Sequence, residues 1–324
     1  MKHYYLVLLI IMLFSCENHQ SLKNNTNIET NKTLNKKSIS LIILGTIQDA
    51  GSPHIACIKE CCKDLFINPD KDRQVVSLGL IDNKHSKKYL FEATPDISRQ
   101  MKSLLKEDIQ NRNEIVDGIF LTHAHIGHYI GLMYLGKEAT NTNNVPVFAM
   151  PKMKKYLETN GPWSQLVTNK NISLTQIEKE QSISLSPNLI ITPFLVPHRD
   201  EFSETVGYKI KGPNKVALFI PDIDKWNKWD KSITEEIKEA DYAFLDATFY
   251  SGKEINNRDI SQIPHPFIIE SLEMFKELDY EDRNKVIFIH FNHTNPVIEL
   301  NSDEAKNIIN QGFNIGRINE IYDL

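Results

Sequence analysis

The segment LTHAHIGHYIGL, residues 121–132, places three histidines within six residues and is the most informative part of this 324-residue chain. It follows VDGIFLT (116–122), an apolar run typical of a buried strand. In an extended or turning loop His123 and His125 point the same way, and His128 returns from the first turn of a helix. Three converging imidazoles suit a divalent metal such as Zn²⁺. The simpler alternative is a surface loop that happens to be rich in histidine.

Three more candidate ligands lie farther along the chain, each at the end of an apolar run. His198 follows FLVP, Asp222 follows ALFIP, and His290 follows VIFI. One such residue alone would be explained by a hydrogen bond at a strand end. Catalytic residues, however, concentrate on loops that a rigid scaffold supports. Together with residues 121–132, these three residues therefore predict a single metal site.

The order of the predicted elements places the chain in the α/β class. We predict strands at 38–46, 75–82, 88–93, 116–122, 145–150, 189–197, 205–212, 215–222, 242–248 and 285–291, and helices at 95–107, 127–137, 151–159, 228–239, 266–278 and 302–311. Because residues 172–222 are a run of strands with little helix, a doubly wound sheet fits poorly. The predicted architecture is a sandwich of two mixed sheets with helices on both outer faces.

The order H-x-H-x-x-H, then a later His, a later Asp and a final His, resembles the metallo-β-lactamase superfamily of binuclear metallohydrolases over nearly all of residues 39–295. The resemblance implies a four-layer αβ/βα sandwich with one or two zinc ions at the active site, iron and manganese being the alternatives. It implies that the first metal is held by His123, His125 and His198. The implied ligands of the second metal are His128, His290 and Asp222, the last bridging both ions.

One position departs from the family pattern. The family has an aspartate between the second and third histidines of the cluster, and this chain has Gly127 there. That carboxylate normally binds the second metal and orients the attacking water. We therefore expect a weakly bound second metal, an enzyme that works with one ion, or a metal other than zinc. A catalytically weakened member of the family is the alternative.

A second metal site is predicted from the cysteines. Cys57, Cys61 and Cys62 lie within one short segment. Three thiols cannot all pair in an oxidising compartment, and a bridge between adjacent cysteines would be strained. A structural zinc with three thiolates and one imidazole accounts for the odd number. The alternative is a disulfide from Cys57 to one neighbour plus a free thiol.

The fourth ligand of this site follows from the resemblance. PqqB-like and PhnP-like members of the superfamily carry an N-terminal cysteine cluster of this kind, and the stretches GTIQDAG, FEATPDI, VPHRDEFSETVGY, LDATFY and HFNHTNP look closest to the PqqB-like group. In the PhnP-like group a histidine three positions after the last active-site histidine completes the site, which here is His293. His54 is the reserve candidate. The spacing C-x-x-x-C-C differs from the expected C-x-C-x-x-C.

The first residues are expected to lie outside the folded domain. Residues 1–16, MKHYYLVLLIIMLFSC, have a basic start and an apolar run of signal-peptide length that ends at Cys16. This end resembles the lipobox of bacterial lipoproteins; an ordinary signal peptide is the alternative. Residues 17–38 are polar and predict a flexible tether, followed by a metallo-β-lactamase-like domain at 39–324. We expect a lipid anchor on a bacterial membrane, facing the periplasm or the cell exterior.

The expected activity is hydrolysis of a small ester or phosphodiester by a metal-activated water. His265, just before the predicted helix 266–278, either donates a proton to the leaving group or caps that helix. Asp222 is the other predicted catalytic residue, through the metals it bridges. Glu92 and Asp246, each at the end of a predicted strand, are candidates to orient ligand imidazoles, although ordinary turn hydrogen bonds or salt bridges explain them nearly as well.

Two other functions remain open at the level of sequence. One is a PqqB-like metal-dependent oxygenase or hydroxylase, and the other is a catalytically degenerate metal-binding lipoprotein. Nucleic-acid binding is not expected, because 37 Lys and Arg against 42 Asp and Glu give a net charge of −5, whereas such domains are normally basic.

Overall fold

Strand β1 (Ile39–Gly45) shows why this sequence forms sheets that are covered on both faces, because all seven of its residues are buried. Leu41 and Ile43 pack in one apolar cluster, and Ile42 and Leu44 pack in another. Successive side chains of a strand point to opposite faces of its sheet. A strand that is apolar on both faces therefore needs another layer of structure on each side.

The computed structural model describes residues 38–105, 113–255 and 259–324. Residues 37–324 form one unit. Cys16 lies outside the described residues, as do segment 1–16 and all of the tether except Ser38, so the lipid anchor stays a prediction. Within the described ranges, no helix is long and apolar enough to cross a membrane.

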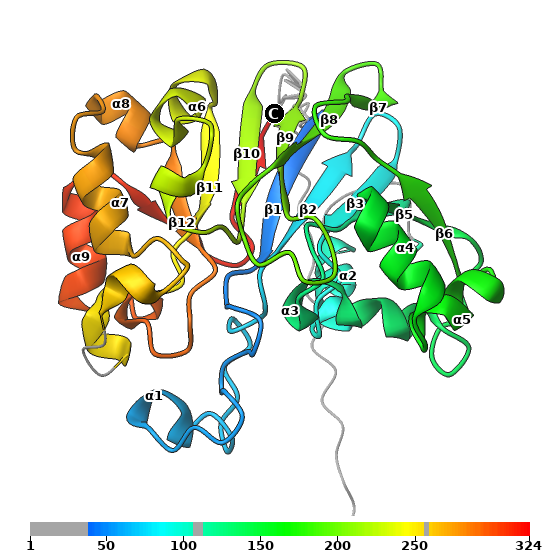
Figure 1. Ribbon diagram of the computed structural model, residues 1–324, viewed down its shortest axis with the longest axis horizontal. Helices are drawn as coiled ribbons and strands as arrows, with labels where there is room; N and C mark the ends of the chain where they lie inside the picture. The colour runs from blue at the N-terminus through cyan, green and yellow to red at the C-terminus, as the bar shows by residue number, and fades with distance from the viewer. Residues whose placement is uncertain (1–37, 106–112, 256–258) are drawn as a thin grey trace, which may run out of the picture. The chain divides into compact units, whose positions relative to one another are not determined.

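The described strands form two mixed sheets (Figure 1). The first sheet has the order β14-β1-β2-β3-β4-β5-β6, in which β1 to β3 are antiparallel and β3 to β6 are parallel. Its remaining strands are β2 (Ser77–Asp82), β3 (Lys87–Phe91), β4 (Gly118–Phe120), β5 (Val145–Ala149), β6 (Ile172–Gln176) and β14 (Ile321–Asp323).

The second sheet has the order β13-β12-β11-β10-β9-β8-β7. Strands β7 to β10 are antiparallel, and β10 to β13 are parallel. These strands are β7 (Ile183–Ser186), β8 (Leu189–Leu195), β9 (Val206–Lys211), β10 (Val216–Ile220), β11 (Tyr242–Asp246), β12 (Val286–Ile289) and β13 (Asn314–Ile315).

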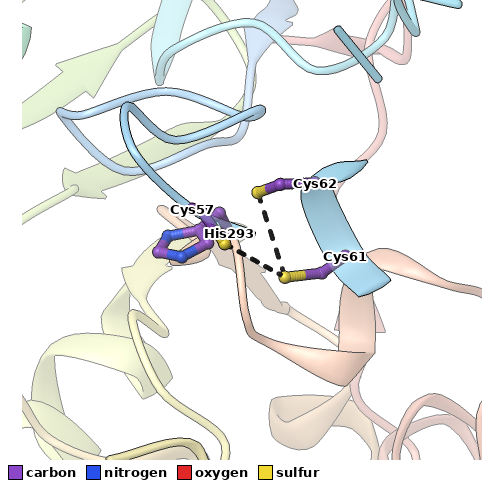
Figure 2. Close-up of side chains that lie close together, drawn as sticks. All are labelled: Cys57, Cys61, Cys62 and His293. Carbon is purple, nitrogen blue, oxygen red and sulfur yellow. Dashed lines mark hydrogen bonds between the residues drawn. The ribbon is translucent and has the colours of Figure 1, made fainter. Parts of the chain in front are cut away.

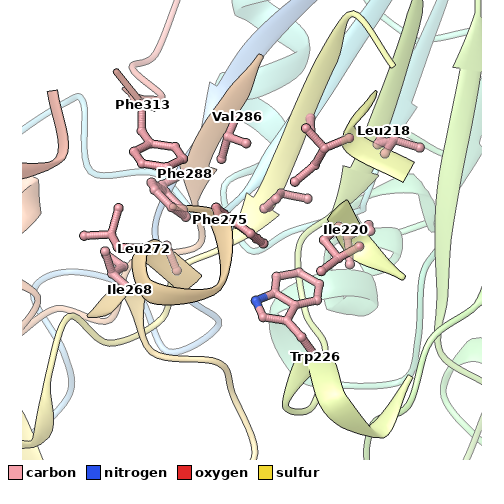
Figure 3. Packing of buried hydrophobic residues seen from close by; sticks show 14 of the residues in the cluster. Leu218, Ile220, Trp226, Ile268, Leu272, Phe275, Val286, Phe288 and Phe313 are labelled. Atoms are coloured by element: carbon pink, nitrogen blue, oxygen red, sulfur yellow. The ribbon is translucent and has the colours of Figure 1, made fainter. Parts of the chain in front are cut away.

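The apolar core is divided into three clusters, as expected for four layers. The cluster between the sheets includes Phe91, Phe120 and Phe219, which are fully buried; burial of each such ring stabilises the fold by roughly 2 kcal/mol. Helices cover the outer face of the first sheet: α2 (Ile97–Leu104), α4 (Pro151–Thr159) and α5 (Trp163–Thr168). Others cover the second sheet: α6 (Ile233–Glu239), α7 (Ile268–Phe275) and α9 (Asp303–Asn310). Figure 3 shows Ile268, Leu272 and Phe275 of α7 within this cluster.

The predicted sandwich is confirmed, and every predicted strand and helix has a counterpart. The predicted helix 127–137 is in fact a short α3 (Ile126–Tyr129) followed by a 3₁₀ helix, Ile130–Leu135. The sequence did not predict β13, β14 or three short helices, α1 (Glu60–Lys63), α5 and α8 (Tyr280–Arg283), and it gave no bounds for β6 and β7 within the run of strands expected at 172–222. These elements are two to six residues long, too short to show a periodic pattern.

One partly buried carboxyl group makes stability depend on pH. Glu254 accepts hydrogen bonds from the backbone N–H groups of Tyr250 and Ser251 (2.6 and 2.8 Å), while its second oxygen has no hydrogen-bond partner among the described residues. Burial raises the pKa of Glu254 from 4.5 to about 7. Because the folded state favours the neutral acid, its stability is highest below the unfolded pKa and is lost as pH rises through 7.

We therefore predict that Glu254→Gln, which removes the charge and keeps an acceptor, stabilises the protein more at pH 8 than at pH 5. The gain should widen by on the order of 1–2 kcal/mol between these pH values. Chemical denaturation of both proteins at the two pH values measures it, with the exposed Glu281→Gln as control. An equal gain at both pH values would contradict this interpretation.

Candidate metal centre

The histidine-rich segment runs from the end of β4 into α3, and buried contacts fix its path. The fully buried Tyr208 donates a hydrogen bond to the carbonyl of Leu121 (2.5 Å), and the Ala124 N–H donates one to Ser203 Oγ (2.8 Å). His125 is extended and precedes α3, and the N–H of His128 donates to the His125 carbonyl (2.9 Å). This turn brings the imidazoles of His123, His125 and His128 to the same side of the segment.

A first cluster joins this segment to the ends of β8 and β10. Ligand atoms of four residues lie within 4.8 Å of one another: His123, His125, His198 and Asp222. His125 Nδ1 is 2.9 Å from His123 Nε2 and 3.3 Å from His198 Nε2. Asp222 Oδ2 is 3.1 Å from His198 Nε2 and 3.3 Å from His123 Nε2. The structure thus brings together the predicted ligands of the first metal.

A second cluster shares Asp222 with the first. It consists of Asp49, His128, Asp222 and His290. His128 Nε2 is 2.8 Å from Asp49 Oδ1 and 3.9 Å from Asp222 Oδ2. His290 Nε2 is 3.2 Å from the same Asp49 oxygen. The predicted ligands of the second metal therefore converge, together with Asp49, which sequence reasoning missed.

The second ring nitrogen of most cluster histidines faces a polar group. Nδ1 of His123 is 2.8 Å from Thr122 Oγ1, and Nδ1 of His198 is 3.2 Å from Asp224 Oδ1. Such partners fix the ring orientation and leave Nε2 for a metal. Asp224 and Thr122 were not predicted, although Asp224 stands only two residues after Asp222.

The two predicted orienting carboxylates occupy the corresponding places in the second cluster. Glu92 Oε1 lies 3.4 Å from His128 Nδ1, close enough for an ion pair but not aligned as a hydrogen bond. Asp246 Oδ1 lies 3.4 Å from His290 Nδ1, which is also 2.9 Å from Thr248 Oγ1. Glu92 and His290 have positive φ angles of 79° and 67°, a strained conformation that is concentrated at functional sites.

The electrostatics of the clusters fit a divalent cation. Burial and the neighbouring His128 hold the pKa of His123 well below its ordinary value. Burial opposes ionisation of Asp222, but the imidazoles around it outweigh burial and hold its pKa well below the usual range. Although burial lowers them, the pKa values of His128, His198 and His290 are raised by the carboxylates around them. Imidazoles and ionised carboxylates packed together in a buried place are the donor set that zinc and related metals prefer.

His265 lies beside the clusters rather than at a helix end. Helix α7 begins at Ile268 with Phe267 at its N-cap, so His265 does not cap it. Its Nδ1 is 2.9 Å from Asp246 Oδ2 and 3.1 Å from Asp222 Oδ1. Although burial lowers the pKa of His265, these two carboxylates raise it well above its ordinary value.

The cysteines form a separate cluster with His293 (Figure 2). Cys61 Sγ is 4.0 Å from Cys57 Sγ and 3.9 Å from Cys62 Sγ, whereas a disulfide requires about 2.05 Å. All three thiols are free, so the disulfide alternative does not form. These separations resemble the roughly 3.8 Å between sulfur atoms that share a tetrahedral zinc with Zn–S bonds of about 2.3 Å.

His54 takes a different position from the one expected of a reserve ligand. Its ring lies against the His293 ring with centroids 4.4 Å apart, and its Nδ1 is 2.7 Å from the Ile55 carbonyl. Its backbone N–H donates to Cys62 Sγ at 3.3 Å. The side chain that joins the three thiols is His293.

Comparison with known proteins agrees with this geometry. A family model described as a beta-lactamase superfamily domain matches residues 87–291. The chain is 24% identical to the coenzyme PQQ synthesis protein B of Rhizobium meliloti over 307 residues, which cover 87% of this chain and 97% of that protein.

Solved structures show the same fold. Zn²⁺-bound PqqB from Methylobacterium extorquens matches with a TM-score of 0.70 at 19% identity, covering 88% of this chain and all (100%) of that one. A diphosphatase from the PhnP family matches with a TM-score of 0.60 at 19% identity, covering 88% and 96% of the two chains.

Proposed function

Because this chain belongs to the metallo-β-lactamase superfamily, we propose that it is a metal-dependent hydrolase of small esters or phosphodiesters. The observation that carries the proposal is the position of Asp222, whose Oδ2 atom lies between two histidine clusters. Such an arrangement suits two cations that share one carboxylate. A metal ion bound there lowers the pKa of its water towards neutrality and polarises an ester or phosphoryl oxygen.

Solvent reaches the centre at His125 and Asp49. The side chains of His125 and Asp49 are 16% and 12% exposed, whereas those of His128, His198 and His290 are fully buried (0%). A catalytic metal site keeps an open position, while a structural site is closed. The exposed edges of His125 and Asp49 therefore support access of water and substrate from that side.

The chain's own residues supply orientation and a proton. Asp224 and Glu92 hold the imidazoles of His198 and His128. His265 Nδ1 is occupied by Asp222 and Asp246, so a proton given to a leaving group would come from its Nε2. Glu92 and Asp224 are positioning residues, whereas His265 is the proposed general acid.

A neighbouring cavity offers one guanidinium to an anionic substrate. The cavity has a volume of about 390 Å³, and its charged lining residues are Arg73, Arg99, Asp49, Asp70 and Asp96. Arg73 pairs with Asp70 and Glu299, but the Arg99 guanidinium has no hydrogen-bond or ion-pair partner in the part of the chain that the structure describes. Guanidinium groups bind phosphate oxygens well, which favours a phosphodiester or diphosphate over a neutral ester.

We propose a separate, structural role for Cys57, Cys61, Cys62 and His293. Their donor set fits a closed tetrahedral zinc site. It ties the loop after β1 to the loop after β12, which His290 begins.

A second candidate activity is a PqqB-like oxidative step, because the coenzyme PQQ synthesis protein B is a relative along most of the chain. Histidine and carboxylate ligands also suit non-haem iron. Oxygen consumption by the Fe²⁺-loaded protein with a phenolic substrate would favour it.

The purified protein, loaded with Zn²⁺, Mn²⁺ or Fe²⁺, should hydrolyse bis(p-nitrophenyl) phosphate or a nucleoside diphosphate analogue faster than p-nitrophenyl acetate. His125→Ala should abolish this turnover. Arg99→Gln should raise KM for the anionic substrates roughly tenfold, the loss of one charge-assisted contact, and leave the ester unaffected. Absence of turnover with all three metals would reject the hydrolase, and metal binding without any activity would favour the degenerate form.

A further inference from the structure

We propose that Asp49 supplies the carboxylate ligand of the second metal that the usual motif aspartate provides elsewhere in the family, a role that Gly127 cannot fill. This inference rests on the proposed function, because it assigns a ligand within that site. It revises the expectation that the glycine leaves the second metal weakly bound.

The Asp49 carboxylate occupies the required position. Its Oδ1 atom lies 2.8 Å from His128 Nε2 and 3.2 Å from His290 Nε2. These are the two histidines that complete the second cluster with Asp222. The side chain is 12% exposed, so it stands where the buried cluster meets solvent.

The orientation of the neighbouring imidazoles is compatible with a cation at this point. Nδ1 of His128 faces Glu92, and Nδ1 of His290 faces Asp246 and Thr248. When Nδ1 carries the proton, Nε2 presents a lone pair. Both Nε2 atoms would then direct lone pairs at the Asp49 carboxylate, an arrangement that a divalent cation among the three groups stabilises.

The space next to Gly127 explains why that position is a glycine. A Cβ atom there would lie 2.4 Å from Asp49 Cα and 2.7 Å from Asp49 Cβ. Both distances are well inside van der Waals contact, and the first is to the backbone, which cannot rotate away. An aspartate at 127 therefore cannot coexist with the present backbone at Asp49. The chain has one carboxylate at this point, and it comes from the loop after β1.

The loop that carries Asp49 is fixed to the strand end that carries His290. Ile47 bridges both Val75 and Phe291. The Gln48 N–H donates to the Phe291 carbonyl at 2.9 Å, and the Phe291 N–H donates to the Thr46 carbonyl at 2.7 Å. Asp49 is therefore held in register with His290, as a ligand must be.

Metal binding tests the proposal independently of catalysis. Asp49→Asn, which keeps the shape and removes the charge, should lose about one equivalent of zinc per chain and weaken the second site by at least 100-fold in competition with a chelator. Substitution of Co²⁺ should show loss of one of the active-site absorption bands. Asp72→Asn, an exposed residue in the same region, is the matched control and should bind metal like the wild type.

Gly127→Ala provides a second test because it removes no ligand atom. Its added Cβ must displace Asp49, so it should lose the same equivalent of zinc while the first cluster and the cysteine cluster keep theirs. Wild-type zinc content and affinity in both Asp49→Asn and Gly127→Ala would overturn the proposal. If Asp49→Asn does not fold, the zinc content of Gly127→Ala alone tests the proposal. Loss of zinc in a protein without hydrolase activity would support Asp49 while rejecting the proposed function.

Discussion

Asp222→Asn is expected to lower turnover by about a thousand-fold or more. Asp222 lies 3.1 to 3.9 Å from ligand nitrogens of both clusters, and asparagine has the same size without the charge. A catalytic metal stabilises the transition state by several kcal/mol, and each 1.36 kcal/mol is a factor of ten in rate. Because one side chain serves both clusters, the variant should also lose active-site metal from both.

Asp224→Asn is the matched control for this substitution. Asp224 stands two residues farther along and contacts His198 only through the ring nitrogen that points away from the cluster. Loss of such an orienting partner costs about 10- to 100-fold. Steady-state rates and metal content of both variants, with circular dichroism to verify folding, make the comparison. Turnover of Asp222→Asn within tenfold of the wild type would contradict the shared-carboxylate arrangement.

Cys62→Ala is expected to produce the largest loss of stability. Cys62 is fully buried and takes part in the cluster of three thiols and His293. Structural zinc binding contributes directly to folding free energy, by about 10 kcal/mol or more in small zinc domains. In a larger chain zinc binding contributes only part of this free energy. We therefore expect the free energy of unfolding to fall by several kcal/mol and the melting temperature to fall by about 10 °C.

The same substitution should weaken the second active-site metal and spare the first. Asp49 lies eight residues before Cys57, and His290 lies three residues before His293, so the cysteine cluster holds both loops that serve the second cluster. His54→Ala is the control and should retain the structural metal, because the His54 ring lies tilted against His293 without joining the four ligand residues, and the substitution keeps the backbone N–H that contacts Cys62 Sγ. Full zinc content and an unchanged melting temperature in Cys62→Ala would exclude a structural metal.

The sequence predicted those parts of the centre whose residues follow recognisable patterns. His123, His125 and His128 are close together in the chain, and His198, Asp222 and His290 each end an apolar run, so pattern and spacing were enough. Asp49 was missed because it lies 79 residues from His128 in a loop without such a run. Its proposed role follows from its distances to His128 and His290 and from the packing of its loop against Gly127.

The same limit applies to the fold. The long strands of both sheets were predicted because their apolar runs are buried on one or both faces, as in β1 and β12. Strand β14, by contrast, has no fully buried residue and exists because it pairs with β1. The local sequence does not determine which distant segments pair as strands.

Anomalous X-ray scattering at the zinc edge from crystals of the purified protein locates each bound metal without reference to activity. We predict one peak among His123, His125, His198 and Asp222, one among Asp49, His128, Asp222 and His290, and one among the three thiols and His293. Absence of any peak beside Asp222 would contradict a metal centre built around this shared carboxylate.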